Sequence, residues 1–144
     1  MKRAIFFIET FIVCFFLVGS VFAEGDRFKI VNHCQKWELK LEKVEKILDR
    51  VMKLTGLNAP SNAITIEIFE SKGDLFAFFQ KTYGAYGGFK SWYDPRSNTI
   101  YISRKTYQDY VLAHEITHAL INQQYGKLPK QIAEKIPNMV EEEF

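Results

Sequence analysis

Two histidines lie four residues apart in the pentapeptide His-Glu-Ile-Thr-His, at positions 114 and 118. In an α-helix, residues at this spacing stand one turn above each other on a single face. Two imidazoles at this spacing on a helix can therefore reach one partner. We predict a helix over residues 105–124, which ends before Gly126 and Pro129.

Such a pair of imidazoles is suited to a metal ion. Neutral imidazole nitrogen binds Zn²⁺ at ~2.0–2.1 Å, and zinc lowers the pKa of a bound water to ~7. Glu115 directly follows the first histidine, about a quarter turn round the helix, where a carboxylate can accept a proton from such a water. The pattern predicts a zinc site with His114 and His118 as ligands and Glu115 as general base. The alternative is a helix whose two histidines bind no metal.

A catalytic zinc site usually has three protein ligands, so a third ligand must come from elsewhere in the chain. The extended motif with a third histidine fails, because Ile121 and Gln124 occupy its positions, and no histidine or aspartate follows His118. The carboxylates that remain downstream are Glu134, Glu141, Glu142 and Glu143.

In these features the chain resembles the gluzincin superfamily of metallopeptidases, and in particular its small minigluzincin members. The run Ile132-Ala-Glu-Lys-Ile136, followed by Asn138, is similar to the setting of the glutamate ligand in that family. The resemblance implies Glu134 as third ligand and Asn138 as a residue that steadies a histidine. Because Glu143 falls on the apolar stripe of a regular helix here, it remains the alternative ligand.

The resemblance also has consequences for the fold and the substrate. It implies a small zincin-like domain, with helices packed on a short mixed sheet and the histidine motif on a central helix. It further implies that strand 99–103 forms the sheet edge beside the cleft, where a peptide could add by main-chain hydrogen bonds. Tyr125, Tyr101 and His33 are candidates, by residue type alone, for the donor that stabilises a developing oxyanion.

The remaining pattern independently predicts an α+β domain. We expect an amphipathic helix at 35–54, a half-buried strand at 64–68, and a second helix that begins at the capping sequence after Ser71. A hairpin is expected from strands 89–93 and 99–103 around a turn-forming cluster. A last helix is expected over 130–144, kinked or interrupted at Pro137.

The N-terminus has the composition of a secretory signal peptide. Residues 2–3 are basic, 11–18 are apolar, and Val21-Phe-Ala23 is typical of a cleavage site. We therefore expect a signal peptide over 1–23, with an uncleaved membrane anchor as the alternative, and one domain over 24–144. Cys34 is then a lone, free thiol in the mature chain.

These observations predict a secreted or periplasmic zinc metallopeptidase that acts on a peptide or protein substrate. If the N-terminal segment stays uncleaved, the domain is anchored to a membrane and still lies outside the cytoplasm. A net charge of only +2 argues against nucleic acid as a partner. Two alternatives remain open: a non-catalytic zinc-binding or peptide-binding module of the same fold, and a membrane-tethered structural protein whose histidines bind nothing.

Overall fold

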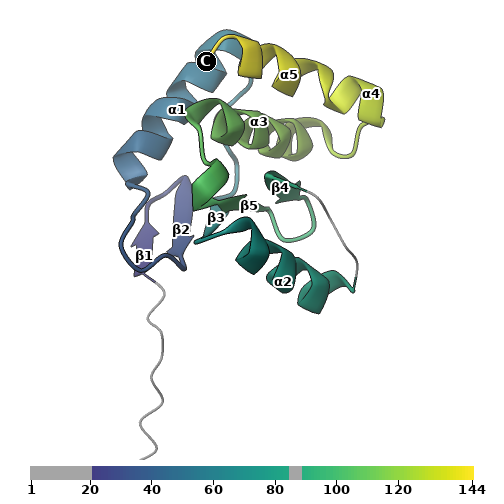
Figure 1. Ribbon diagram of the computed structural model, residues 1–144. Helices are drawn as coiled ribbons and strands as arrows, with labels where there is room; N and C mark the ends of the chain where they lie inside the picture. Colours follow the sequence, from purple (N-terminus) through teal and green to yellow (C-terminus); the bar gives the residue numbers. More distant parts are fainter. Residues whose placement is uncertain (1–20, 85–88) are drawn as a thin grey trace, which may run out of the picture.

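A mixed β-sheet forms one layer of the protein (Figure 1). The computed structural model describes residues 21–84 and 89–144, so most of the expected signal or anchor segment lies outside the described residues. Within them the sheet has the order β1-β2-β3-β5-β4. Strands β2, β3 and β5 are parallel, and β1 and β4 are antiparallel to their neighbours. The strands are β1 Val21–Glu24, β2 Phe28–Asn32, β3 Ile64–Phe69, β4 Ser91–Asp94 and β5 Thr99–Ser103.

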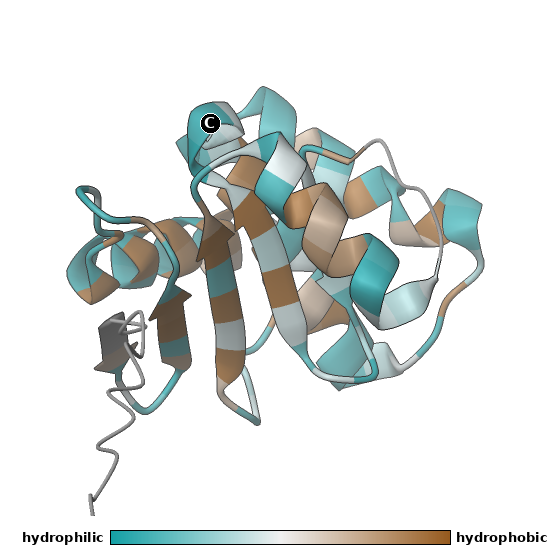
Figure 2. Cartoon of the chain, turned by 60° about the horizontal axis from the view of Figure 1, so that its bottom comes forward, coloured by the Kyte–Doolittle hydropathy of each residue, from teal (hydrophilic) through white to brown (hydrophobic). Residues whose placement is uncertain are grey.

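Alternation along the strands divides the side chains between two faces of the sheet. Ile64, Ile66 and Ile68 are fully buried on one face, whereas Phe69 and Tyr101 belong to a separate cluster on the other. The banding of apolar and polar residues along the strands is visible in Figure 2. The α+β prediction is confirmed, but β1 and β2 were not predicted. β1 includes Val21-Phe-Ala23, the residues expected to precede the cleavage site.

Helix α1, Leu41–Thr55, packs on the first face of the sheet through Val44, Leu48 and Val51. It ends at Gly56, whose φ of 70° is the left-handed conformation that glycine adopts most easily. The prediction that this helix begins at residue 35 is wrong. The Asn32 side chain bonds the Cys34 amide and the Trp37 carbonyl, and this holds the chain before residue 41 in a non-helical loop.

Helix α2, Lys72–Tyr83, covers the opposite face of the sheet (Figure 1). As the capping sequence predicts, its N-cap is Ser71, whose Oγ accepts from the Asp74 amide at 3.2 Å. The helix ends at Gly84, again with a left-handed φ of 67°.

The helix that carries both histidines, α3 Asp109–Tyr125, lies between the sheet and the C-terminal helices. It begins four residues later than predicted, because residues 104–106 form a 3-10 turn. Because α3 is contacted on two sides, apolar residues occupy most of its own surface. The most deeply buried, each at most 1% exposed, are Leu112, Ala113, Ile116, Ala119 and Leu120.

The C-terminal segment is divided into α4, Lys130–Ala133, and α5, Lys135–Glu142. The expected interruption exists, but it lies at Glu134 rather than at Pro137 itself. Pro137 has no N–H for the carbonyl four residues earlier, that of Ala133, and its ring would clash with that carbonyl. The helix therefore breaks at Glu134, and Pro137 falls in the first turn of α5, where a missing N–H costs little.

The hairpin of β4 and β5 is confirmed, but its strands are not arranged as expected. β5 lies inside the sheet between β3 and β4, so the expectation that strand 99–103 forms the edge is wrong. The edge beside α3 is β4. Among the residues described, no helix combines the length and apolarity needed to cross a membrane.

Candidate metal centre

His114 and His118 point their imidazoles to the same place, as their spacing on α3 predicts. Their Nε2 atoms lie 3.1 Å apart, and the side chains are only 17% and 18% exposed. The pKa of His118 lies below its ordinary value, because burial disfavours its charged form and the nearby His114 acts in the same direction, while Glu134 opposes them. A neutral imidazole is the form that binds a metal.

Glu134 completes a three-membered group with these histidines. Its Oε2 lies 3.6 Å from His114 Nε2 and 3.4 Å from His118 Nε2. One ion at ~2.0–2.1 Å from three ligand atoms, at tetrahedral angles, requires those atoms to lie ~3.3–3.4 Å apart. The observed triangle, with sides of 3.1, 3.4 and 3.6 Å, fits this requirement closely. The residues could therefore hold a metal ion such as Zn²⁺.

The break between α4 and α5 explains why Glu134, and not Glu143, joins the group. Glu134 sits at the break and is anchored by its own carbonyl, which accepts from the Asn138 amide at 3.0 Å. Helix α5 then runs along α3 with Pro137 and Val140 buried. Glu143 follows the end of α5, where its side chain is exposed and its carbonyl accepts from Arg50.

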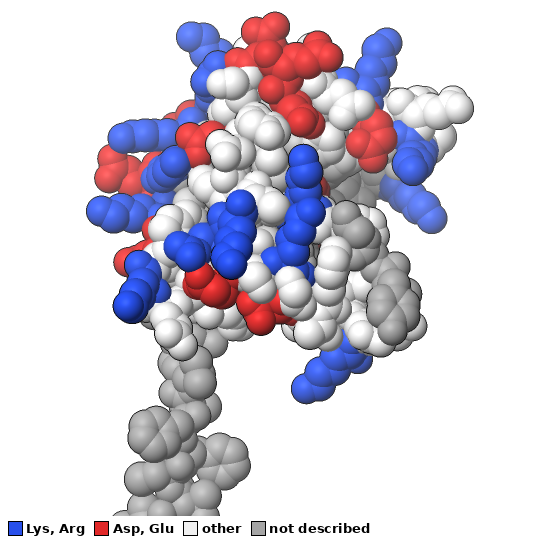
Figure 3. Space-filling model, in the orientation of Figure 1, with Lys and Arg blue, Asp and Glu red and all other residues white. Residues whose placement is uncertain are grey.

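A second carboxylate approaches the far side of the His114 ring. Glu141 Oε2 lies 3.1 Å from His114 Nδ1, at ion-pair distance, but the contact lacks hydrogen-bond geometry, and this buried nitrogen has no hydrogen-bond partner in the described residues. The expectation that Asn138 steadies a histidine is not met, since Asn138 is exposed and Glu141 occupies that place. A carboxylate at this position can fix the orientation of the ring. Acidic side chains gather over α5 at the top of Figure 3 and favour a cation nearby.

Glu115 is 7% exposed and lies against the edge strand. Ser91 Oγ donates to its Oε1 at 2.6 Å, and the backbone N–H of Tyr93 donates to the same carboxylate. Burial raises the pKa of Glu115 above its ordinary value, while the Ser91 hydroxyl and then His114 oppose that rise. Such a carboxyl is a better proton acceptor than an exposed one.

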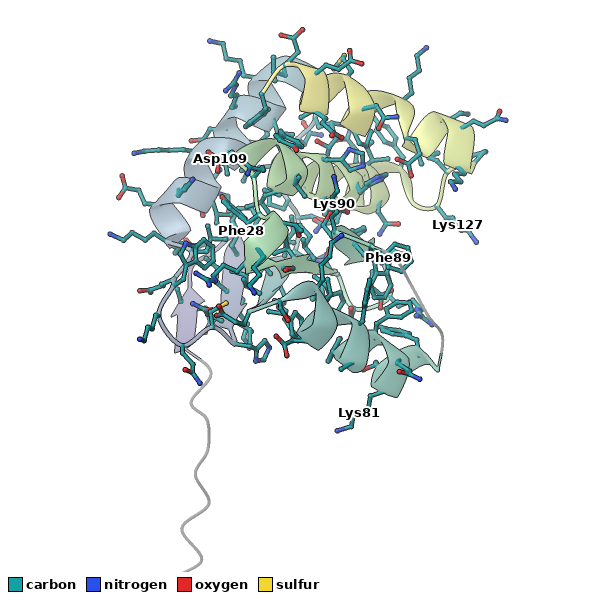
Figure 4. All side chains as sticks on the ribbon, in the orientation of Figure 1. Phe28, Lys81, Phe89, Lys90, Asp109 and Lys127 are labelled. Atoms are coloured by element: carbon teal, nitrogen blue, oxygen red, sulfur yellow. The ribbon has the colours of Figure 1, made fainter. Side chains whose placement is uncertain are left out.

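A cleft of about 380 Å³ opens over this group. Its walls are mainly apolar, from the edge strand, α3 and the loop that joins α3 to α4. Two lysines also line it, of which Lys127 appears in Figure 4 on the same side of the molecule as Phe89. The apolar and aromatic lining residues are Phe89, Trp92, Tyr93, Pro95, Ile121, Leu128 and Ala133.

None of the three candidate oxyanion donors lines this cleft. Tyr125 is 58% exposed, Tyr101 is buried on the α2 side of the sheet, and His33 lies 3.2 Å from Glu67. Sequence reasoning missed Ser91 and Asn122, which do line the cleft. Asn122 stands four residues after His118 on the same helical face, so its spacing was a usable signal, whereas nothing in the sequence pattern pointed to Ser91.

Comparison of the chain with protein-family models, with curated proteins and with solved structures finds no match. The assignment of a function therefore depends on the residues and their geometry.

Proposed function

We propose that this protein is a zinc metallopeptidase with a zincin-like fold that hydrolyses peptide bonds outside the cytoplasm. The observation that carries the proposal is the triangle of His114, His118 and Glu134, with the buried carboxylate of Glu115 next to it on α3. The group brings two side chains of α3 and one from the break between α4 and α5 to ligand distances of one another. The resemblance to gluzincins supports the same conclusion.

In this proposal His114, His118 and Glu134 hold the ion, which when bound supplies Lewis-acid polarisation of a carbonyl and lowers the pKa of water. Glu115 accepts the proton of the attacking water and then transfers it to the leaving amine. Glu141 holds the His114 ring in the orientation that presents Nε2. The apolar walls of the cleft exclude bulk water and strengthen these electrostatic interactions.

The decisive experiment pairs metal analysis with a cleavage assay on a broad peptide library. Wild type should bind zinc at one equivalent and cleave, and Glu115→Gln should retain zinc but lose cleavage. The matched control is Glu142→Gln, which changes an exposed carboxylate on α5 and should behave as wild type. A Glu115→Gln protein with full activity would refute the mechanism.

The same measurements distinguish the alternatives. Stoichiometric zinc with no cleavage of any peptide would identify a non-catalytic zinc-binding or peptide-binding module. Protein purified without chelator that contains no zinc would contradict the metal site and leave a structural role for the chain.

A further inference from the structure

The edge strand β4 contributes more to the site than a wall of the cleft. Ser91 Oγ donates to Glu115 Oε1 at 2.6 Å, within the range of strong, charge-assisted O–H···O⁻ hydrogen bonds. The backbone N–H of Tyr93, two residues further on, donates to the same carboxylate. Both donors come from a strand 22–24 residues away from Glu115 in the sequence.

The pattern of the antiparallel ladder explains why the main-chain donor, the Tyr93 N–H, is free to reach Glu115. Within residues 21–84 and 89–144, strand β4 pairs with β5 alone, and the carbonyl of Lys90 accepts from the Ser103 amide. Along an antiparallel strand, main-chain groups point alternately towards the partner and away from it. Ser91 and Tyr93 therefore direct their main-chain groups to the free edge, where the Tyr93 N–H meets the Glu115 carboxylate.

A glutamate side chain has several rotatable bonds, so its carboxylate is an inefficient general base unless a hydrogen bond fixes its orientation. A displacement of about 1 Å can cost on the order of 10²-fold in rate. The Ser91 hydroxyl is the one side-chain hydrogen-bond donor to Glu115 in the described part of the chain. It lines the same cleft as His114 and His118.

We propose that Ser91 is a positioning residue that holds the Glu115 carboxylate in the orientation needed to accept the proton of the attacking water. This inference rests on the proposed peptidase function. Ser91 acts through Glu115, and in the described residues its hydroxyl makes no hydrogen bond to His114, His118 or Glu134, so its removal should lower kcat and leave KM and zinc binding almost unchanged.

The test compares steady-state kinetics and zinc content of the wild type with Ser91→Ala and Ser91→Thr. Ser91→Ala should lower kcat by roughly 10- to 100-fold with KM changed by less than about threefold. Ser91→Thr should recover most of kcat, since threonine keeps the hydroxyl and suits a strand. Ser97→Ala is the matched control, because Ser97 also donates to a carboxylate of this hairpin, Asp94, but is exposed.

If Ser91→Ala does not fold, Ser91→Cys replaces it, since a thiol of similar size is a much weaker donor and should also lower kcat. A Ser91→Ala or Ser91→Cys protein with the kcat of wild type would overturn this inference and leave the peptidase proposal intact. Equal losses in Ser91→Thr and Ser91→Ala, or loss of zinc in both, would show a merely structural role and overturn it too. Absence of cleavage by wild type would overturn both proposals.

Discussion

Replacement of Glu141 by alanine should weaken zinc binding, although Glu141 is not among the three proposed ligands. Its Oε2 lies 3.1 Å from His114 Nδ1, a buried nitrogen that has no hydrogen-bond partner in the described residues. Without the carboxylate, the ring loses the contact that fixes its orientation. Loss of such a partner typically costs ~10–100-fold in metal affinity.

The exposure of Glu141 places the expected effect at the lower end of that range. Its side chain is 44% exposed, so water screens the contact and can partly replace it. We expect about a tenfold loss of affinity, which corresponds to ~1.4 kcal/mol. Glu141→Gln should lose less, because its amide oxygen can still lie against His114 Nδ1.

The assay is competition for zinc against a chelator of known affinity, at fixed pH and ionic strength. Glu142→Ala is the control, since it removes the neighbouring exposed carboxylate and changes the net charge equally. If Glu141→Ala bound zinc as tightly as Glu142→Ala, the reasoning from the 3.1 Å contact would be refuted. A loss produced by Asn138→Ala instead would restore the role first expected for that residue.

The remaining predictions concern the third ligand, the thiol and the core. Glu134→Ala should lose zinc by elemental analysis while Glu143→Ala keeps it; the opposite result would make Glu143 the ligand. Burial and the neighbouring Glu70 raise the pKa of Cys34 to about 11 from 9.0, so between pH 7 and 8 the folded protein has about a hundredfold less thiolate than an unfolded chain. Alkylation by iodoacetamide should therefore be slow until the pH nears 11 or the protein unfolds. Rapid labelling of the folded protein at pH 7 would contradict this. Leu48→Ala, at a fully buried position of α1, should lower the free energy of unfolding in urea by roughly 2–5 kcal/mol, whereas Leu54→Ala, 36% exposed on the same helix, should change it far less; equal effects would refute the packing of α1.

Local pattern was sufficient for much of the fold. The α1 stripe, the Ser71 cap and the alternation in β3 depend on neighbours within one or two turns, so their prediction needed no knowledge of the rest of the chain. The start of α1 was misplaced because the Asn32 side chain holds the preceding loop, and this contact is not encoded as a periodicity. Strands β1 and β2 were not predicted. They have only 4 and 5 residues, too few for alternation to stand out from the surrounding sequence.

The candidate metal centre shows most clearly what local pattern predicts and what tertiary packing decides. The sequence by itself determined that two imidazoles share a helical face with a carboxylate beside them, because the α-helix has a fixed repeat and the three residues lie within five positions. Only the tertiary structure decided that the helix break brings Glu134 to ligand distance from the histidines, and that Glu141 lies beside His114 Nδ1. It also decided that β4 is the edge strand and that its Ser91 donates to Glu115. Those contacts join separate elements of the fold. The packing of α5 on α3 and the order of the strands depend on the whole core, so the spacing of residues within one element cannot specify them.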